Sequence, residues 1–383
     1  MSGIMDPPPS PPTELGRYRV LCPTAGIRVS PLQLGGMSIG SAWSDVMGSM
    51  NKDQSFKLLD AYFEKGGNFI DTSNNYQYED SEQWIGEWLA ARKNRDQIVL
   101  ATKFTSDYQS HKYGKGRVVN SCGNHRKSLQ MSLRDSLTKL QTDYIDILYL
   151  HWWDWTTSIE EVMDALHIVV QQGKVLYLGI SDTPAWVVSA ANTYAKAAGK
   201  TPFSIYQGRW NVMLRDFERD IIPMARHFGM ALAPWDVVGG GKFQTAEEVE
   251  ARKKNGESLR PLRGKEQTEQ EFKVSSALAK VAEEHGIKSV TAIAIAYVMA
   301  KYPYVYPILG GRRVQHLEDN IKGLSIVLTE TQIQELEGVT SFDIGFPLDF
   351  IGRELSETLK PHPRLSTAGV LAILPNAHPI QHA

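Results

Sequence analysis

Four polar side chains are of types that together could deliver a proton to a carbonyl oxygen: Asp71, Tyr76, Lys103 and His151. A tyrosine ordinarily titrates near pH ~10, so it exchanges protons at neutrality only where a nearby cation stabilises its phenolate. Lys103 could supply that cation, and Asp71 could hold the ammonium in place and keep it charged. His151 could donate a hydrogen bond to the substrate oxygen. The pattern predicts a carbonyl-reducing oxidoreductase with Tyr76 as proton donor.

Short apolar runs alternate with amphipathic segments along the whole chain. The apolar runs predict eight strands, at residues 32–38, 69–72, 98–104, 144–151, 175–181, 204–211, 230–235 and 304–310. The amphipathic segments predict helices at residues 53–65, 81–92, 125–139, 158–172, 184–198, 215–227 and 275–284. This alternation favours a single (β/α)8 TIM barrel, whose catalytic residues gather at the carboxyl ends of the strands. An open doubly wound sheet stays possible, although its usual G-x-G-x-x-G signature is absent.

We expect the barrel to occupy residues 19–340, after a proline-rich arm at 1–18 and before a C-terminal extension at 341–383. The extension could cover the barrel mouth or form a loose tail. Two long connections follow the third and seventh predicted strands, at residues 105–123 and 237–273. Connections of that length are often functional, and both would lie on the catalytic rim.

Composition narrows the classes of partner. The 383 residues include 41 Lys and Arg and 43 Asp and Glu, so a net charge of -2 provides no general attraction for nucleic acid or an anionic membrane. The longest apolar runs, such as residues 291–300, are far shorter than the roughly 20 residues of a membrane helix. We therefore expect a small-molecule partner.

Cysteine and histidine usage indicates a reduced compartment and no metal. The chain has two cysteines, Cys22 and Cys122, and its first residues lack the pattern of a secretory leader, so we expect a cytoplasmic protein. Its ten histidines form no H-x-H or H-E-x-x-H pattern, and two distant cysteines cannot build a thiolate site, so no metal is expected.

Three blocks resemble the signatures of the aldo-keto reductase superfamily, whose catalytic tetrad is Asp, Tyr, Lys and His. They are Phe-Ile-Asp-Thr-Ser-Asn-Asn-Tyr at 69–76, Ala-Thr-Lys at 101–103 and Leu-His-Trp at 150–152. Together with similar blocks at 172–181 and 308–320, the resemblance spans roughly residues 30–340. Within the superfamily the chain looks most like the fungal aryl-alcohol dehydrogenases, because of Asp-Thr-Pro-Ala-Trp-Val-Val at 182–188 and Ala-Pro-Trp at 233–235. Members of that group are NADPH-linked reductases of benzylic aldehydes, so the resemblance implies an aromatic aldehyde or alcohol as substrate.

The resemblance also implies where NADPH would bind. It places the adenosine 2′-phosphate near Gly311, Arg312 and His316, and the adenine near Asn320. Arg312 lies just before a predicted helix at 314–323, where an anion would be favoured by the helix dipole.

For the nicotinamide, the resemblance assigns Ser181, Asp182 and Gln207 to the amide and Trp235 to stacking on the ring. Asp182 departs from the frequent Asn and keeps an acceptor but no amide donor. Further cofactor contacts are expected from Gly36, Met37, Asp71, Gly239, Gly240, Lys242 and Arg252. The glycine run at 239–241 could let backbone amides approach the pyrophosphate, although such a run is also typical of a flexible loop.

Tryptophans near the predicted rim suggest an aromatic substrate. Trp152 and Trp153 follow His151, and Trp43 follows the first strand, so an aryl ring could stack among them. Alternatively, these rings pack the rim against the two long connections. The substrate could also be an aromatic polyketide intermediate.

Two further functions stay open. Some barrels of this superfamily serve as cofactor-binding, redox-sensing subunits with little turnover. Residues 36–40 also match the G-x-S-x-G nucleophile elbow of hydrolases, although they follow the first strand, too early for the usual order.

Overall fold

A computed structural model of the chain describes residues 5–47, 50–254, 266–377 and 379. At its centre, eight parallel strands lie in the order β10-β3-β4-β5-β6-β7-β8-β9. They are β3 (Gln33–Gly35), β4 (Phe69–Asp71), β5 (Val99–Phe104), β6 (Ile145–Leu150), β7 (Val175–Ser181), β8 (Phe203–Arg209), β9 (Ala231–Trp235) and β10 (Ile308–Leu309). Leu232 on β9 exchanges backbone hydrogen bonds with Tyr304 and Tyr306, just before β10, and nearly closes the sheet into a barrel. The predicted (β/α)8 TIM barrel is confirmed.

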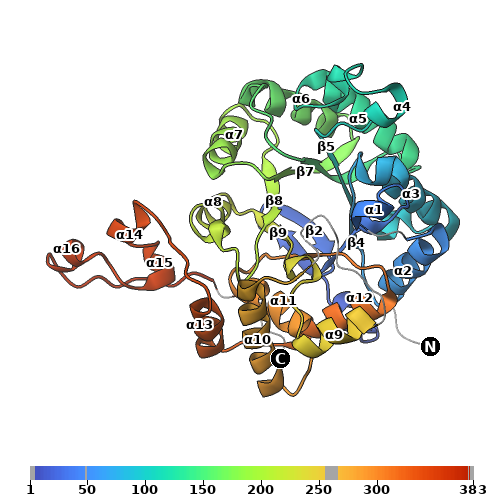
Figure 1. The fold of residues 1–383 in the computed structure, drawn as a ribbon. Helices are drawn as coiled ribbons and strands as arrows, with labels where there is room; N and C mark the ends of the chain where they lie inside the picture. The colour runs from blue at the N-terminus through green and yellow to red at the C-terminus, as the bar shows by residue number, and fades with distance from the viewer. Residues whose placement is uncertain (1–4, 48–49, 255–265, 378, 380–383) are drawn as a thin grey trace.

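Helices surround the strands as a ring (Figure 1). They are α2 (Lys52–Glu64), α3 (Asp80–Arg92), α5 (Arg126–Lys139), α6 (Ile159–Gln171), α7 (Ala185–Ala197), α8 (Ile221–Phe228), α10 (Glu269–Glu284), α11 (Val290–Ala300), α12 (Val314–Lys322) and α13 (Glu330–Gly338). Two starts differ from the prediction. Helix α8 begins later than expected, which places Pro223 in its first turn, where a missing N–H is tolerated. Helix α10 begins earlier, because Thr268 and Glu271 form a capping box.

An antiparallel hairpin that was not predicted from the sequence, β1 (Arg19–Cys22) with β2 (Ala25–Val29), precedes the barrel. Its side chains Leu21, Cys22, Ala25 and Val29 are buried in one cluster with interior residues of the barrel strands. The Cys22 thiol donates to the carbonyl of Ser204, near the beginning of β8. The hairpin therefore closes the amino end of the barrel and leaves the carboxyl end for a site.

The two long connections contain short helices. The first, after β5, contains α4 (Ser110–Tyr113) and the 3-10 turn η5 (Val119–Ser121). The second, after β9, contains the 3-10 turn η7 (Gly239–Gly241) and α9 (Ala246–Lys254), and the described chain resumes before α10.

The C-terminal extension carries α14 (Leu348–Ile351), α15 (Leu355–Thr358) and α16 (Pro363–Ser366). Figure 1 shows these helices to the side of α8 and α13, outside the ring. Arg226 on α8 forms ion pairs with Glu354 and Glu357, and the Arg219 guanidinium donates to the carbonyl of Asp343. These three helices are thus attached to the flank of the barrel and do not lie over its mouth.

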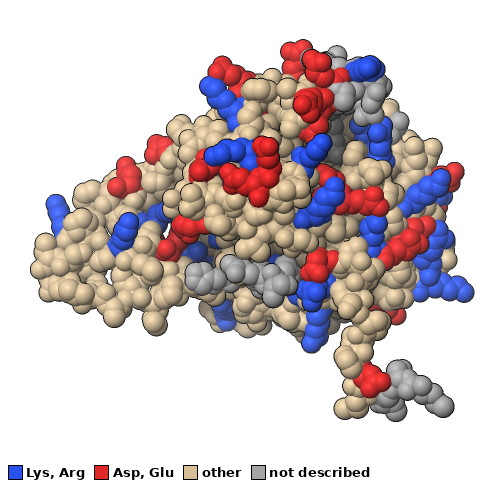
Figure 2. Space-filling model, turned by 90° about the horizontal axis from the view of Figure 1, so that it is seen from below, with Lys and Arg blue, Asp and Glu red and all other residues tan. Residues whose placement is uncertain are grey.

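Charged side chains of both signs are interspersed on the face seen in Figure 2, so this face has no extended field of a single sign. Within the described residues, no helix combines the length and apolar character needed to cross a bilayer.

Candidate active site

The four predicted catalytic side chains meet at the carboxyl end of the barrel. Asp71 ends β4, Tyr76 begins the 3-10 turn η3 (Tyr76–Glu79), Lys103 lies in β5, and His151 follows β6. Lys103 Nζ lies 2.6 Å from Asp71 Oδ2 and 3.5 Å from Tyr76 Oη. The rings of Tyr76 and His151 meet edge to face, with centroids 5.9 Å apart. The folded chain therefore brings together residues from three neighbouring strand ends.

Lys103 is fully buried, and its ammonium is held by three oxygen acceptors. Besides Asp71 and Tyr76, it donates to the carbonyl of Thr72 at 2.8 Å. Burial lowers the pKa of Lys103 below its usual value, and the neighbouring Asp71 carboxylate opposes that change. A buried cation with a paired carboxylate and directed hydrogen bonds is a fixed source of positive potential.

Tyr76 holds its proton firmly in this arrangement. Burial raises the pKa of Tyr76 well above its usual value, and the negative charges of Asp71 and Asp182 raise it further. Lys103 lies beside the phenol, but the phenol rather than the phenolate is the form favoured here. A neutral phenol is the form that can donate a proton.

His151 is a neutral hydrogen-bonding group. Burial, and then the charge of Lys103, lower the pKa of His151 to about 3. Its Nδ1 lies 3.2 Å from Ser73 Oγ and 3.4 Å from Ser106 Oγ. Either hydroxyl can donate to Nδ1, which would leave the imidazole proton on Nε2. Ser73 and Ser106 were not predicted as site residues, although Ser73 lies inside the motif at 69–76 and Ser106 follows β5 closely.

Gln207 on β8 reaches across the barrel to Asp71. Its Nε2 donates to Asp71 Oδ1 at 2.9 Å, while Asp71 Oδ2 accepts from Lys103. Both carboxylate oxygens are thus committed to partners. Gln207, predicted as a nicotinamide contact, also orients the carboxylate that holds Lys103.

Comparison with known proteins identifies the scaffold. Residues 31–341 match the aldo/keto reductase family. The chain belongs to the aldo/keto reductase family. It is 65% identical to a putative aryl-alcohol dehydrogenase, AAD14, of Saccharomyces cerevisiae, over 97% of this chain and 99% of that protein. It is 56% identical to an aryl-alcohol dehydrogenase [NADP(+)] of Phanerodontia chrysosporium, over 91% of this chain and 92% of that protein. Norsolorinic acid reductase A of Aspergillus parasiticus is 51% identical, over 91% of this chain and 87% of that protein.

These relationships make the protein an oxidoreductase, and the family indicates a nicotinamide cofactor. Polar groups at the mouth of this reductase fit such a cofactor. The Ser181 hydroxyl, at the end of β7, is buried and has no hydrogen-bond partner among the described residues. Next to it, Asp182 is exposed at the strand end and accepts a hydrogen bond from Trp235 Nε1 at 3.3 Å. Trp235 ends β9, so its indole N–H reaches past the intervening β8 to the end of β7, and this bond fixes one edge of the ring.

The remaining predicted cofactor contacts lie just after β3 and in the second long connection, after β9. Gly36 lies close to β4, where an added Cβ would lie 2.9 Å from the Asp71 carbonyl oxygen. The Met37 carbonyl accepts from Gln77 at 2.9 Å. Lys242 is buried and ion-paired with Glu271 at 3.2 Å, so its charge is already compensated.

Gly239 and Gly240 form a tight turn with positive φ at both residues. The Gly239 N–H donates to the Asp236 carbonyl at 2.8 Å, whereas the lack of a Cβ at Gly240 lets its backbone come close to a ligand. The side chain of Arg252, on α9, lies outside the described residues.

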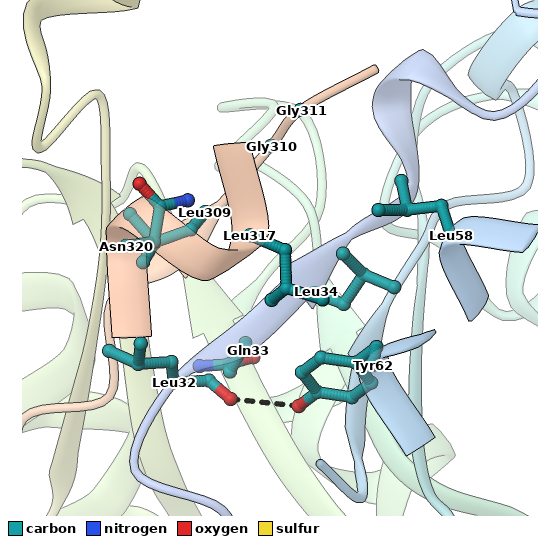
Figure 3. A pocket seen from close by; sticks show the side chains of 10 residues that line it. All are labelled: Leu32, Gln33, Leu34, Leu58, Tyr62, Leu309, Gly310, Gly311, Leu317 and Asn320. Carbon is teal, nitrogen blue, oxygen red and sulfur yellow. Dashed lines mark hydrogen bonds between the residues drawn. The ribbon is translucent and has the colours of Figure 1, made fainter. Parts of the chain in front are cut away.

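The predicted adenosine end of the site lies around the start of α12. Arg313 is the N-cap of this helix and makes no side-chain capping bond, so the first helical N–H groups lack the usual cap. Gly311 lies against His316, whose Nδ1 accepts from the Arg312 N–H at 3.4 Å. Figure 3 shows Gly311 and Asn320 among the residues lining a small cavity between α12, β10, β3 and α2. An anion is favoured at such an uncapped helix start.

The tryptophans predicted to bind substrate fall into two groups. Trp43 packs edge to face on Tyr76 with centroids 6.2 Å apart, and Trp152 is 40% exposed with its indole donating to Ser106 Oγ at 3.1 Å. Trp153 is only 9% exposed and lies in the main hydrophobic core. The prediction that Trp153 lines the substrate pocket stays a prediction, and the burial of this side chain favours the alternative that its ring packs the barrel rim.

The alternative hydrolase motif finds no support in its geometry. Ser38 is 1% exposed and lies inside a 3-10 turn, η2 (Gly36–Ser38), rather than at a strand-to-helix elbow. Among the residues that the structure describes, no cluster of His, Cys, Asp and Glu could hold a metal ion.

Proposed function

We propose that this protein reduces aromatic aldehydes to alcohols with NADPH and catalyses the reverse oxidation. The observation that carries the proposal is the Tyr76 hydroxyl 3.5 Å from the ammonium of the buried Lys103–Asp71 ion pair, at the end of the barrel that the hairpin leaves open. A carbonyl oxygen that contacts Tyr76 Oη would lie next to both a proton donor and a fixed positive charge.

When bound, NADPH would supply the hydride that adds to the carbonyl carbon. As negative charge develops on the oxygen, Tyr76 transfers its Oη proton to it. Lys103, held by Asp71 at 2.6 Å, stabilises the phenolate that remains. Neutral His151 orients the carbonyl by donating a hydrogen bond from its ring, since its pKa of about 3 keeps it uncharged.

Selection of NADPH over NADH is proposed to come from the start of α12. The uncapped N–H groups and the guanidinium groups of Arg312 and Arg313 would favour the adenosine 2′-phosphate. Gly311 and His316 shape the adjoining turn, and Asn320, which lines the small cavity beside it, is proposed to contact the adenine. Ser181, Asp182, Gln207 and Trp235 are the groups proposed to surround the nicotinamide.

Aromatic selectivity is proposed to come from Trp43 and Trp152. Trp43 packs edge to face against the ring of Tyr76, and Trp152 is linked to His151 by hydrogen bonds through Ser106. Both rings thus flank the proposed carbonyl position, where an aryl group could stack on them.

The test is the loss of NADPH absorbance with veratraldehyde and, in parallel, with a straight-chain aldehyde, using NADH as the control cofactor. We expect faster oxidation with the aromatic substrate and NADPH. Tyr76→Phe should lower turnover by at least about 100-fold, because it removes the proton donor, while cofactor affinity stays close to wild type. A variant that keeps most of its turnover would exclude Tyr76 as the donor. Tight NADPH binding without turnover across a panel of aldehydes would instead indicate a redox-sensing subunit.

A second candidate is the reduction of an aromatic polyketide intermediate. It is favoured by the 51% identity to a reductase named for norsolorinic acid. The two substrates can be separated by kcat/KM, since a polycyclic aromatic ketone should be the better substrate if this candidate is correct and veratraldehyde if it is not.

A further inference from the structure

Asp182 carries a carboxylate that lies at the mouth of the barrel and forms no ion pair with the described residues. It follows β7 directly, and its backbone N–H donates to the Gln207 carbonyl at 3.0 Å. Its φ of +41° lies in the left-handed region, which Asp and Asn tolerate better than most residues. Its side chain accepts a hydrogen bond from Trp235 Nε1 at 3.3 Å. Among the described residues it forms no ion pair within 4.0 Å, and it is exposed at this end of the barrel.

The other charged groups around this space are already paired. Asp71 pairs with Lys103 at 2.6 Å, and Asp236, which follows β9, pairs with Arg209 at 2.7 Å. Among the described residues around this space, Asp182 therefore contributes a negative charge that no ion pair compensates. Asp182 is bonded through its backbone to Gln207, whose side chain donates to Asp71 at 2.9 Å, so it lies close to the reaction centre. Its charge raises the pKa of Tyr76 and opposes the lowering of the pKa of Lys103 by burial.

A nicotinamide that transfers hydride to a carbonyl in contact with Tyr76 must itself lie within a few ångströms of that carbonyl. The oxidised ring carries a positive charge and the reduced ring is neutral. A carboxylate close enough to act on Tyr76 and Lys103 must then interact differently with the two redox states.

We infer that Asp182 sets the relative affinity of the enzyme for oxidised over reduced cofactor, by stabilising the cationic nicotinamide ring with its carboxylate. This inference rests on the proposed function, because it needs the cofactor in the barrel mouth. Stronger binding of the oxidised form lowers the free energy of the state reached after hydride transfer to the carbonyl. Asp182 would thus bias the bound equilibrium toward aldehyde reduction, whereas an asparagine at this position would not.

The effect should depend on pH. Although the residue as a whole is exposed, desolvation of its carboxylate raises the pKa of Asp182 to about 6. The carboxylate is therefore charged at neutral pH and becomes protonated below pH ~6. Of the groups facing the same space, His151 has a pKa of about 3 and Tyr76 a pKa well above its usual value, while the ion pairs Lys103–Asp71 and Arg209–Asp236 are internally compensated. Preference for oxidised cofactor should therefore fall as pH drops through about 6.

The test is the ratio of the dissociation constants of NADP+ and NADPH, measured by quenching of tryptophan fluorescence. The cofactor 2′-phosphate also titrates near pH ~6, but it is common to both forms and cancels in the ratio. Asp182→Asn is the informative variant, since Asn tolerates the same backbone conformation and its carbonyl can still accept from Trp235. Asp164→Asn, on the outer helix α6 beside Lys200, is the matched control.

We expect Asp182→Asn to shift the ratio about tenfold toward NADPH at neutral pH and to remove its change between pH ~7.5 and ~5. Asp164→Asn should leave both unchanged. If both cofactors bind and the ratio in Asp182→Asn equals that of the wild type, the inference is overturned while the proposed function stands. If neither cofactor binds the wild-type protein, the proposed function fails and the inference with it.

Discussion

The two ends of this barrel differ in the chemical character of their buried side chains, which are apolar at one end and ionic at the other. At the amino end, the hairpin inserts Leu21, Cys22, Ala25 and Val29 among apolar side chains of the strands. At the carboxyl end, Lys103 and Asp71 are buried as ions only a few residues along the same strands. One β5 strand thus carries Val99 in the apolar cluster and Lys103 in the ionic one.

The difference shows where this fold gains stability and where it places chemistry. Apolar burial at the hairpin stabilises the folded state by about 25 cal/mol per Å². Burying a lysine and an aspartate carries a desolvation cost that their pairing only partly offsets. Because apolar burial and the catalytic ion pair lie at different ends, the stability gained at the amino end can offset the desolvation cost of burying Lys103 and Asp71. Substitutions at the two ends should therefore have separable effects on stability and turnover.

The largest effect should come from the apolar end. Leu21 is fully buried, so Leu21→Ala should lower the free energy of unfolding by about 2–5 kcal/mol through lost burial and the cavity it leaves. The neighbouring Val20 is 46% exposed, and Val20→Ala should change stability by less than about 0.5 kcal/mol. Urea denaturation measures both. The kcat of folded Leu21→Ala should match the wild type, and a parallel loss of kcat would show that the two ends are coupled.

At the ionic end, stability should depend on pH through His151. Its folded pKa of about 3 lies below the ordinary value of ~6.5, so the unfolded chain binds the proton more readily. The stabilisation is fully present above pH ~6.5 and is lost as pH falls toward the folded pKa. Between pH ~6.5 and ~5 the loss should be about 2 kcal/mol.

The measurement is the difference in unfolding free energy between wild type and His151→Gln across that pH range. The raised pKa of Asp182 acts in the opposite direction, and taking the difference removes its contribution. A difference that is constant with pH would mean that His151 titrates normally in the folded protein.

The barrel could be predicted from the sequence because each strand is marked by its own apolar run, and the four catalytic residues because they fall at strand ends. The hairpin could not, since the short runs Arg19–Cys22 and Ala25–Val29 become buried only against the finished barrel. Local patterns contain no information on that contact. Its buried face is determined by the barrel interior rather than by its own periodicity.

Partners distant in sequence explain the other differences. Lys242 was expected to contact the cofactor, but Glu271 on α10 compensates its charge. Ser158 caps α6 through the Glu161 N–H, and the Glu161 side chain accepts from the Arg126 N–H on α5. In both cases packing between helices determines which partner the side chain takes.

The smallest expected effect concerns Trp152 and Trp153, adjacent residues of which the first is 40% exposed and the second is buried in the main core. Trp152→Ala should raise the KM for an aromatic aldehyde by about 3–10-fold, because a stacked aromatic pair is worth about 0.5–1.5 kcal/mol. The KM for a straight-chain aldehyde should change much less, since no ring is stacked. Trp155→Ala is the control, because Trp155 is 66% exposed and packs on Trp186 instead of joining Ser106. Equal KM increases for both aldehydes would mean that Trp152 acts by positioning Ser106 and His151 rather than by holding the aryl ring.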